Sequence, residues 1–324
     1  MKAVLYHKYG NTDELKLQDI EKPVPGDNQI LIKVYAVSIN DWDLGLLNGT
    51  PFVNRIINGL IKPKQKILGS DIAGVIESTG NNVKRYKAGD EVFGDISGQW
   101  GGFAEYVCTE ENSICLKPES MSFEEAAAIP QAGMLAVQGL IDKGCITHGQ
   151  KVLINGAGGG VGTFAAQIAK QYGVELTGVD VSDKFDIMRE VGFHYIIDYT
   201  KEDFTKNGLK YDVIIDNKFN RFITHYLHSL KKNGIYVILG GSLFRLFTAL
   251  LLSPLIKLFS GKQIKIVDLK PNKDLDYIKK LFESGKMKPI IDGHFSLKKI
   301  QKAFKHYKDG DFKGKLVISV NSHK

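Results

Sequence analysis

The chain has 324 residues, of which 43% are hydrophobic and 24% charged, and its net charge is +7. This length and composition favour two globular domains with sizeable cores. Its 34 glycines follow no collagen-like period, so collagen, a coiled coil and bulk disorder are excluded. The net charge of the residues from Lys257 onward is +10, but their lysines are interspersed with acidic and apolar residues. This pattern indicates a solvated face and not a nucleic-acid site.

The first 120 or so residues are predicted to form β structure. The N-terminal residues 1–6 read as a strand and lack the apolar core of a signal peptide. Short apolar runs separated by Gly, Asn and Asp turns follow at 30–37, 72–76, 91–93 and 103–107. Many short strands with frequent glycine predict a barrel or sandwich.

From Lys151 the pattern changes to strands alternating with helices. Ser122 and the acids after it open a helical stretch that precedes this change. Strands are predicted at 152–154, 175–179, 195–197, 213–215 and 236–239, with a helix at 162–172 and another through 187–188. Such alternation predicts a parallel sheet with helices on both faces.

The most apolar window of the chain is 246–259, and it is interrupted by Ser253 and Pro254. It is shorter than the roughly 20 residues of a membrane span, so we expect a buried or oligomer-facing helix with a kink. Two more helices, at 276–283 and 297–307, and a strand at 315–320 complete the prediction.

The strongest motif is the glycine-rich loop that joins the strand at 152–154 to the helix after it. A second strand ends in Asp180, 18 residues beyond Gly162. Small residues permit a tight turn and let backbone N–H groups approach a pyrophosphate at a helix N-terminus. We therefore predict a dinucleotide site whose loop residues are Ala157, Gly158, Gly159, Gly160, Val161 and Gly162. No Lys-Ser/Thr ending follows, which disfavours ATPase chemistry.

The residues after the second strand leave NAD and NADP both open. Asp180 stands where a carboxylate would accept hydrogen bonds from the adenosine ribose, which favours NAD. Ser182, Lys184 and Tyr199 are candidate neighbours of a 2′-phosphate. A helix cap, a surface lysine and a packed tyrosine would explain these three equally well.

Several further motifs accompany this loop, and together they resemble a known family over essentially the whole chain. They lie at 69–74 (GSDIAG), 88–94 (AGDEVFG), 102–106 (GFAEY), 197–200 (IDYT) and 314–317 (GKLV). The combination resembles the zinc-free, quinone-oxidoreductase-like branch of the medium-chain dehydrogenase/reductase superfamily. The resemblance implies an α/β chain with a GroES-like β-barrel domain at 1–122 and a Rossmann doubly wound parallel sheet at 123–265. Residues 266–324 would return to complete the first domain.

The sequence departs from the zinc enzymes of this superfamily at their ligand positions. The chain has Ser38 and Asn40 where those enzymes carry a cysteine, and Ser70 in place of a histidine. Cys108, Cys115 and Cys145 form no CxxC pair, which argues against a zinc lobe or a disulfide framework and indicates a reducing compartment. We expect no catalytic metal and a cytoplasmic protein.

The resemblance also supplies candidate catalytic residues. Asn40 would lie near the nicotinamide and donate to a substrate oxygen, with Asp43 or Tyr106 positioning or relaying a proton. Turn and cap chemistry after a strand would equally account for Asn40 and Asp43. Further groups are implied beside the nicotinamide, although ordinary turns would also explain them: Gly133, Asn217, Gly240 and Gly241.

These features predict a zinc-independent oxidoreductase that transfers hydride from NADPH or NADH to a quinone, an enone or a related activated carbonyl. Without a Lewis acid, an acceptor that delocalises charge is the easier substrate. Two alternatives stay open: a zinc-free alcohol or enoyl-thioester reductase, and a non-catalytic nucleotide-binding protein with a basic interaction tail. We expect no nucleic acid partner and no membrane span, and the apolar window is compatible with a homodimer.

Overall fold

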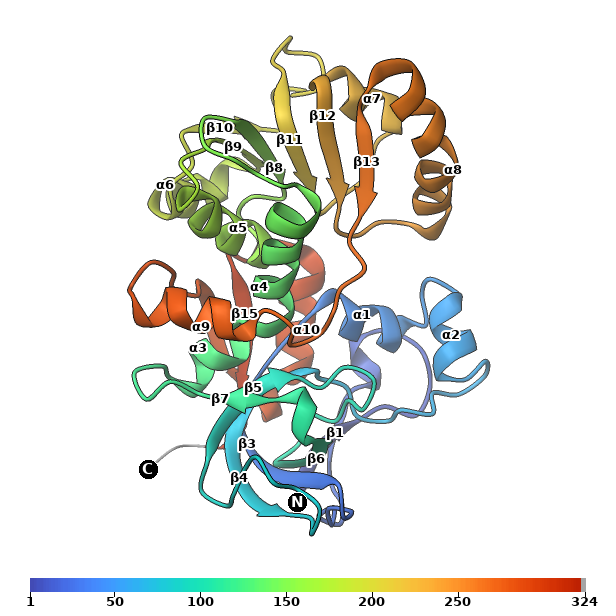
Figure 1. Ribbon diagram of the computed structural model, residues 1–324. Coiled ribbons are helices and arrows are strands. Elements are labelled where there is room, and N and C mark those ends of the chain that lie inside the picture. The colour runs from blue at the N-terminus through green and yellow to red at the C-terminus, as the bar shows by residue number, and fades with distance from the viewer. Residues whose placement is uncertain (322–324) are drawn as a thin grey trace. The chain divides into compact units, whose positions relative to one another are not determined.

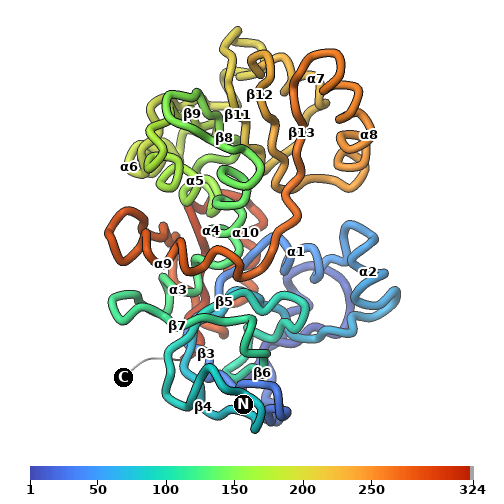
Figure 2. Tube along the Cα trace, viewed as in Figure 1, coloured from blue at the N-terminus to red at the C-terminus, as the bar shows by residue number. Residues whose placement is uncertain are grey.

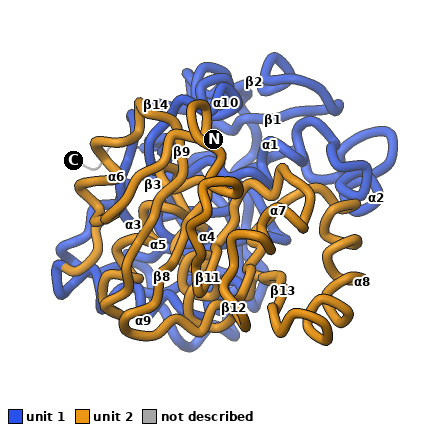
Figure 3. The backbone as a smooth tube through the Cα atoms, turned by 90° about the horizontal axis from the view of Figure 1, so that it is seen from above, with its two compact units in different colours: residues 1–131, 271–285, 289–324 blue, residues 132–270, 286–288 orange. Residues whose placement is uncertain are grey.

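The computed structural model describes residues 1–321, and these divide into two compact units. Unit 1 comprises residues 1–131, 271–285 and those from 289 on, and unit 2 comprises 132–270 and 286–288. The chain therefore leaves unit 1, builds unit 2 and returns, as Figures 2 and 3 show. The domain assignment made from the sequence has slightly different boundaries, and we retain it as a proposal.

Unit 1 is built on a mixed sheet of seven strands and a separate two-stranded ribbon. The strands are β1 (Lys2–Leu5), β2 (Lys16–Asp19), β3 (Gln29–Ser38), β4 (Asp71–Thr79), β5 (Glu91–Asp95), β6 (Tyr106–Glu110), β7 (Cys115–Leu116), β14 (Ile291–Ser296) and β15 (Lys315–Ser319). The large sheet has the order β14-β15-β3-β4-β5-β7, and β6 pairs with β3 beside this path. β3 is the longest strand, and its apolar side chains lie at the centre of the core of unit 1.

The helices of unit 1 are short, with six to ten residues each. They are α1 (Asp41–Asn48), α2 (Val53–Asn58), α3 (Phe123–Ala128), α9 (Leu275–Glu283) and α10 (Ile300–Asp309), with single 3₁₀ turns η1 (Thr12–Glu14), η2 (Glu111–Ser113) and η5 (Leu297–Lys299). The sequence did not predict α1 and α2, because their six to eight residues are too few for a helical period to show. The predicted strand at 103–107 lies three residues later, at β6, and Ala104 forms a single bridge with Ala3.

Unit 2 is a parallel sheet of six strands in the order β10-β9-β8-β11-β12-β13. The strands are β8 (Lys151–Asn155), β9 (Glu175–Asp180), β10 (Tyr195–Asp198), β11 (Tyr211–Asp216), β12 (Leu230–Ile238) and β13 (Gln263–Ile266). The sequence prediction of alternating strands and helices is confirmed here. Figure 1 shows α5 and α6 beside the β8–β10 half of this sheet and α7 and α8 beside the other half.

The helical elements of unit 2 begin with α4 (Pro130–Val137), which crosses the unit boundary and continues into the π-helical turn η3 (Gln138–Lys143). The others are α5 (Gly160–Lys170), η4 (Ser182–Lys184), α6 (Phe185–Val191), α7 (Ile223–His228) and α8 (Leu243–Ser260).

The apolar window 246–259 forms a helix, but of its two predicted forms the buried helix is wrong, while the oligomer-facing helix stays a prediction. α8 contains this window, and Ala249 is its only buried residue. Leu246 and Ile256 are partly buried against the core of unit 2, while Phe244 and Phe259 are 79% and 83% exposed. The sequence could not show this, because the helix is apolar on every side and its period does not mark an inner face.

By length and composition, α8 is also the one helix among residues 1–321 that could cross a membrane. Such a single helix is weak evidence of a span.

Candidate active site

The predicted phosphate loop follows β8 and ends at the start of α5. Gly156 has a positive φ of 85° and donates its N–H to the carbonyl oxygen of Val179 at 2.9 Å. A Cβ on Gly162 would stand 2.4 Å from the carbonyl oxygens of Gly156 and Ala157, so only glycine lets α5 approach the loop this closely. At Gly159 the nearest atom to such a Cβ is 3.6 Å away.

The N-terminus of α5 suits an anionic ligand. α5 has no acidic residue in its first turn and no side-chain cap at Gly159. The first N–H groups of any α-helix, here those of Gly160, Val161 and Gly162, have no partner within the helix. Together with the positive end of the helix dipole they fit a pyrophosphate.

The residues predicted to choose between NAD and NADP lie together at the ends of β9 and β10. Asp180 accepts the N–H of Gly158 on Oδ2 at 2.9 Å and that of Val181 on Oδ1 at 3.0 Å. Lys184 is buried, and its Nζ lies 3.7 Å from Asp180 Oδ1. Its aliphatic carbons pack on Gly158, where an added Cβ would lie 2.6 Å from Lys184 Cβ. The prediction that Lys184 is either a phosphate neighbour or a surface lysine is therefore wrong in its second part.

Ser182 and Tyr199 stand beside this pair. Ser182 is exposed, and the Tyr199 side chain is 51% exposed while its backbone N–H donates to the carbonyl oxygen of Asp180 at 3.3 Å. The structure thus gathers an acid, a buried cation and two exposed hydroxyl groups at one edge of the sheet.

The other predicted cofactor residues are divided between this edge and a helix. Asn217 follows β11 and donates Nδ2 to the carbonyl oxygen of Asn155 at the end of β8, at 3.3 Å. Gly240 and Gly241 follow β12, and a Cβ on Gly240 would meet nothing within 4 Å. Gly133 is buried on α4. The chain crosses from one side of the sheet to the other between β8 and β11, which is where open parallel sheets bind ligands.

A second polar group lies in unit 1, where four strands of its sheet line up. Ser38 at the end of β3 pairs in register with Asp71 of β4, and Asp71 pairs with Asp95 of β5. On the other side of β3, Ser38 pairs with Val317, two residues beyond Lys315. The register alone therefore brings a serine, two carboxylates and a lysine to one edge of the sheet.

Lys315 is the centre of this buried cluster. Its Nζ donates to the carbonyl oxygen of Ile39 at 3.2 Å and also to Oδ1 of Asn40, and it lies 3.8 Å from Asp71 Oδ2. Burial lowers the pKa of Lys315, although the nearby carboxylates oppose that shift. An ammonium has donors only, so it fixes Asn40 with its oxygen towards Lys315 and its NH₂ group turned away. Asn40 Nδ2 lies 3.5 Å from Ser70 Oγ.

Asp43 and Asp71 are both fully buried carboxylates. Asp43 accepts the N–H of Asn40 at 2.9 Å and that of Gly69 at 2.8 Å, so it joins the start of α1 to the chain before β4. Asp71 Oδ2 accepts the N–H of Gln131 at 3.1 Å, whereas its Oδ1 has no partner. Burial raises the pKa of Asp43 and of Asp71 to about 7. Asp43 therefore has a structural task in addition to any proton transfer.

Tyr106 is not brought to this cluster. It pairs with Lys33 at the far part of β3, five residues from Ser38, which is about 16 Å along a strand. Lys22 Nζ lies over its ring at 3.9 Å. The structure therefore brings Asn40 and Asp43 together and leaves Tyr106 apart.

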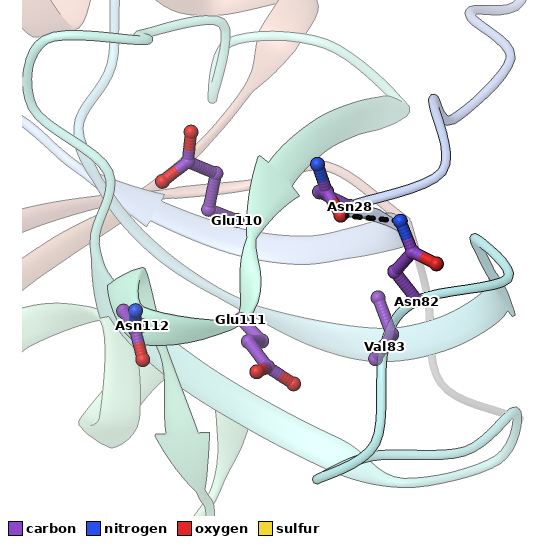
Figure 4. A pocket seen from close by; sticks show the side chains of 6 residues that line it. All are labelled: Asn28, Asn82, Val83, Glu110, Glu111 and Asn112. Carbon is purple, nitrogen blue, oxygen red and sulfur yellow. Dashed lines mark hydrogen bonds between the residues drawn. The ribbon is translucent and has the colours of Figure 1, made fainter.

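A polar surface pocket of about 320 Å³ lies at that far end of β3 (Figure 4). It is lined by Asn28, Asn82, Val83, Glu110, Glu111 and Asn112, and Asn82 Nδ2 donates to Asn28 Oδ1 at 2.9 Å. The backbone N–H groups of Lys84 and Arg85 both lie 3.3 Å from Glu111 Oε2. None of the predicted site residues lines it.

The side chains around Asn40 are poor ligands for zinc. Ser38, Ser70, Asp71 and Lys315 offer no thiolate or imidazole, and the ammonium would repel a divalent cation. Within residues 1–321, no group of three or more His, Cys, Asp or Glu side chains is arranged to hold a metal ion.

Lys315 and Asp71 form the ion pair of the cluster, and neither was predicted as a site residue from the sequence. A signal was present, because Lys315 opens an otherwise apolar strand, Leu316 to Ile318, and a charge at a buried strand position needs a partner. The sequence could not identify that partner, since Asp71 lies more than 240 residues away along the chain.

Comparisons with known proteins agree on both units. The alcohol dehydrogenase GroES-like domain family matches residues 26–119, and the zinc-binding dehydrogenase family matches residues 191–318. The chain is 33% identical to 2-methylene-furan-3-one reductase of Solanum lycopersicum and 32% identical to an NADPH-dependent alkenal/one oxidoreductase of Arabidopsis thaliana. Each match covers 98% of this chain and 79% of the relative.

A solved structure shows the same fold over the whole length. The quinone oxidoreductase from Coxiella burnetii superposes with a TM-score of 0.87 and 30% sequence identity, covering 99% of each chain.

Proposed function

The chain belongs to the medium-chain dehydrogenase/reductase superfamily, in its quinone-oxidoreductase-like branch, and we propose that it reduces quinones and enones with hydride from NADPH or NADH, without zinc. It is an oxidoreductase that uses a nicotinamide cofactor. The observation that carries the substrate class is the Asn40 amide. Lys315 binds its oxygen, and its NH₂ group donates to Ser70 Oγ at 3.5 Å and has a second N–H for a substrate oxygen.

The glycine loop would hold the cofactor by its pyrophosphate, at the N–H groups that begin α5. Asp180, Ser182, Lys184 and Tyr199 would surround the adenosine ribose, with Asn217, Gly240 and Gly241 along the same strand ends. When bound, the nicotinamide supplies the hydride.

Asn40 would donate a hydrogen bond from Nδ2 to the oxygen of a quinone or enone, where negative charge accumulates as the hydride arrives. One donor is sufficient when the acceptor delocalises that charge over a conjugated system. The positive charge of Lys315 on the other side of the amide polarises it in the favourable direction. A simple carbonyl would leave the charge on a single oxygen and is therefore the poorer substrate.

The substrate class is tested by following NADPH and NADH oxidation optically with quinones, enones, enoyl thioesters and simple ketones, before and after dialysis against a chelator. We expect turnover of quinones and enones that the chelator does not change. Turnover confined to enoyl thioesters or to simple ketones would contradict the proposal.

Asn40→Ala tests the donor itself. The loss of one donor to a developing oxyanion lowers kcat by about 10²-fold in enzymes that depend on it, and we expect a decrease of that order for the quinone and the enone alike. Asn81→Ala, which changes an exposed turn of unit 1, is the matched control and should keep full activity. An Asn40→Ala enzyme with normal kcat would exclude the assigned role.

A further inference from the structure

α8 exposes an apolar surface that neither unit 2 nor the reductase chemistry uses. At 100° per residue, the buried Ala249 and the half-buried Leu246, Ser253 and Ile256 fall on one narrow stripe, and the half-buried Arg245 and Thr248 lie outside it. The opposite half of the helix carries large apolar side chains that are more than half exposed: Phe244, Phe247, Leu251, Leu255, Leu258 and Phe259. Soluble monomers seldom leave such a continuous apolar surface uncovered.

The connections of α8 determine how it can meet a bilayer. It follows β12 and precedes β13, and these two strands pair in parallel in the sheet of unit 2. Figure 1 shows α8 running beside β13. Both ends of the helix are therefore held at the same sheet. Its 18 residues span about 27 Å, so it could cross a bilayer only by leaving the sheet, whereas lying in the interface requires no unfolding.

The charge around α8 indicates what covers it. From residue 217 to residue 267 the chain has no Asp or Glu but six lysines and two arginines. Arg221 and Lys231 pair with Asp203 and Asp212 outside this segment, and the other six cations carry a charge of +6. On the helix itself, Arg245 and Lys257 fall at the margins of the apolar arc. Arg245 donates to the carbonyl oxygen of Phe219 at 2.7 Å, while Lys257 is exposed.

An apolar centre with a basic surround matches the surface of an anionic membrane. A second copy of the chain fits less well. A symmetric pairing of α8 with itself would bring together two segments that lack acids and that each carry six cations besides the paired Arg221 and Lys231. A groove of about 340 Å³ beside the helix has the same character, because Leu227, Leu255 and Phe259 line it together with His228 and Lys262.

We propose that the outward face of α8 docks unit 2 on an anionic lipid bilayer as a helix lying in the interface. The proposal is independent of the substrate class. Docking on the bilayer would bring the enzyme to the lipid phase, in which apolar quinones dissolve.

The test is sedimentation of the full chain with vesicles of phosphatidylcholine alone or with added phosphatidylglycerol. We expect about tenfold more wild-type protein in the pellet with the anionic vesicles, falling again when the salt concentration is raised. Phe247→Glu/Leu251→Glu should abolish this binding. Both side chains are about 60% exposed, so the variant should keep its fold and its activity on a water-soluble quinone. Tyr195→Glu/Leu209→Glu is the matched control, since it adds the same charge at two exposed apolar positions of unit 2.

Three results would overturn the proposal. The first is no binding of the wild-type chain to either vesicle, and the second is equal binding of the two double variants. The third is a wild-type dimer, measured by light scattering, that Phe247→Glu/Leu251→Glu converts to a monomer without any vesicle binding, which would make the face an interface between copies. Reductase activity is measured separately, so its absence would count against the proposed function and not against the membrane surface.

Discussion

The ammonium of Lys315 lies 3.8 Å from Asp71 Oδ2 and donates to Asn40, so one buried cation serves two polar side chains. A neutral side chain at position 315 would free the Asn40 amide to rotate. Above about pH 7, where Asp71 ionises, it would also leave that carboxylate without its counter-ion. Uncompensated buried charges are costly to a fold, at about 3–5 kcal/mol when one partner of a pair is removed.

These two tasks of Lys315 can be separated by mutation. We expect Lys315→Met to lower both kcat and the melting temperature. In Lys315→Met/Asp71→Asn the unpaired charge is also gone, so most of the melting temperature should return while kcat stays about tenfold low. Thermal melts and steady-state kinetics on both variants check this, with KM for NADPH as the control that should not move. Recovery of kcat together with stability would show that Lys315 does not position Asn40.

Cofactor choice also belongs to single residues. The Asp180 carboxylate accepts a hydrogen bond from the Gly158 N–H and pairs with the Lys184 ammonium, and both partners offset part of its negative charge. We therefore propose that the enzyme accepts both NADPH and NADH. Asp180→Ala should shift the ratio of the two affinities towards NADPH by about tenfold, and Lys184→Met should shift it towards NADH. Calorimetric titration measures both ratios. If neither ratio changes, these residues do not contact the ribose or its phosphate.

Among the elements, the junction of β8 with α5 makes the sharpest demand on the sequence. The Gly162→Ala methyl would stand 2.4 Å from two carbonyl oxygens, and overpacking of this kind costs about 1–3 kcal/mol. Gly159→Ala is the matched control in the same loop, because its Cβ meets only one oxygen at 3.6 Å.

We expect Gly162→Ala to lower the urea midpoint and Gly159→Ala to leave it unchanged. Gly159→Ala should instead weaken dinucleotide binding, since its methyl would face the pyrophosphate. Equal urea midpoints for the two variants would contradict the close approach of α5, and undiminished affinity in Gly159→Ala would contradict the loop assignment.

The elements also show how far a sequence can be interpreted without a structure. The parallel sheet was predictable because each strand is an apolar run and α5, which follows the first strand, has one apolar face. The glycine loop was predictable for the same local reason. α1 and α2 were too short to show a period, and the exposure of α8 depends on how little of it the neighbouring strands cover. The contact of Lys315 with Asn40 joins residues 275 apart, which no local pattern encodes.

For the molecule as a whole, the buried acids of unit 1 set a pH dependence of stability. Burial raises the pKa of Asp43 and Asp71 from about 4 to about 7 in the folded chain. Between these values the folded state holds protons that the unfolded state has released, so the free energy of unfolding falls as pH rises towards 7. Hydrogen bonds from Thr200 and Thr205 lower the pKa values of Asp198 and Asp203. These two residues therefore change the free energy of unfolding only at more acidic pH.

We therefore expect the melting temperature to be several degrees higher at about pH 5.5 than at about pH 8. In Asp71→Asn the amide at position 71 cannot ionise, so the decrease of the melting temperature with pH should be smaller. Thermal melts of both proteins across this range are the measurement. A wild-type melting temperature that rises with pH would show that the two acids are ionised throughout.

The division of the chain has a consequence for its biosynthesis. Unit 2 is one nearly continuous stretch, 132–270, and its sheet can form as soon as that stretch leaves the ribosome. In unit 1, β3 is paired along its length with β4, but residues 36–38 on its other side must wait for β15. During translation of all of unit 2, this strand end carries unpaired backbone groups and the acids have no lysine beside them. The nascent chain is most exposed to misassembly in that interval, and ribosome-associated chaperones would act there.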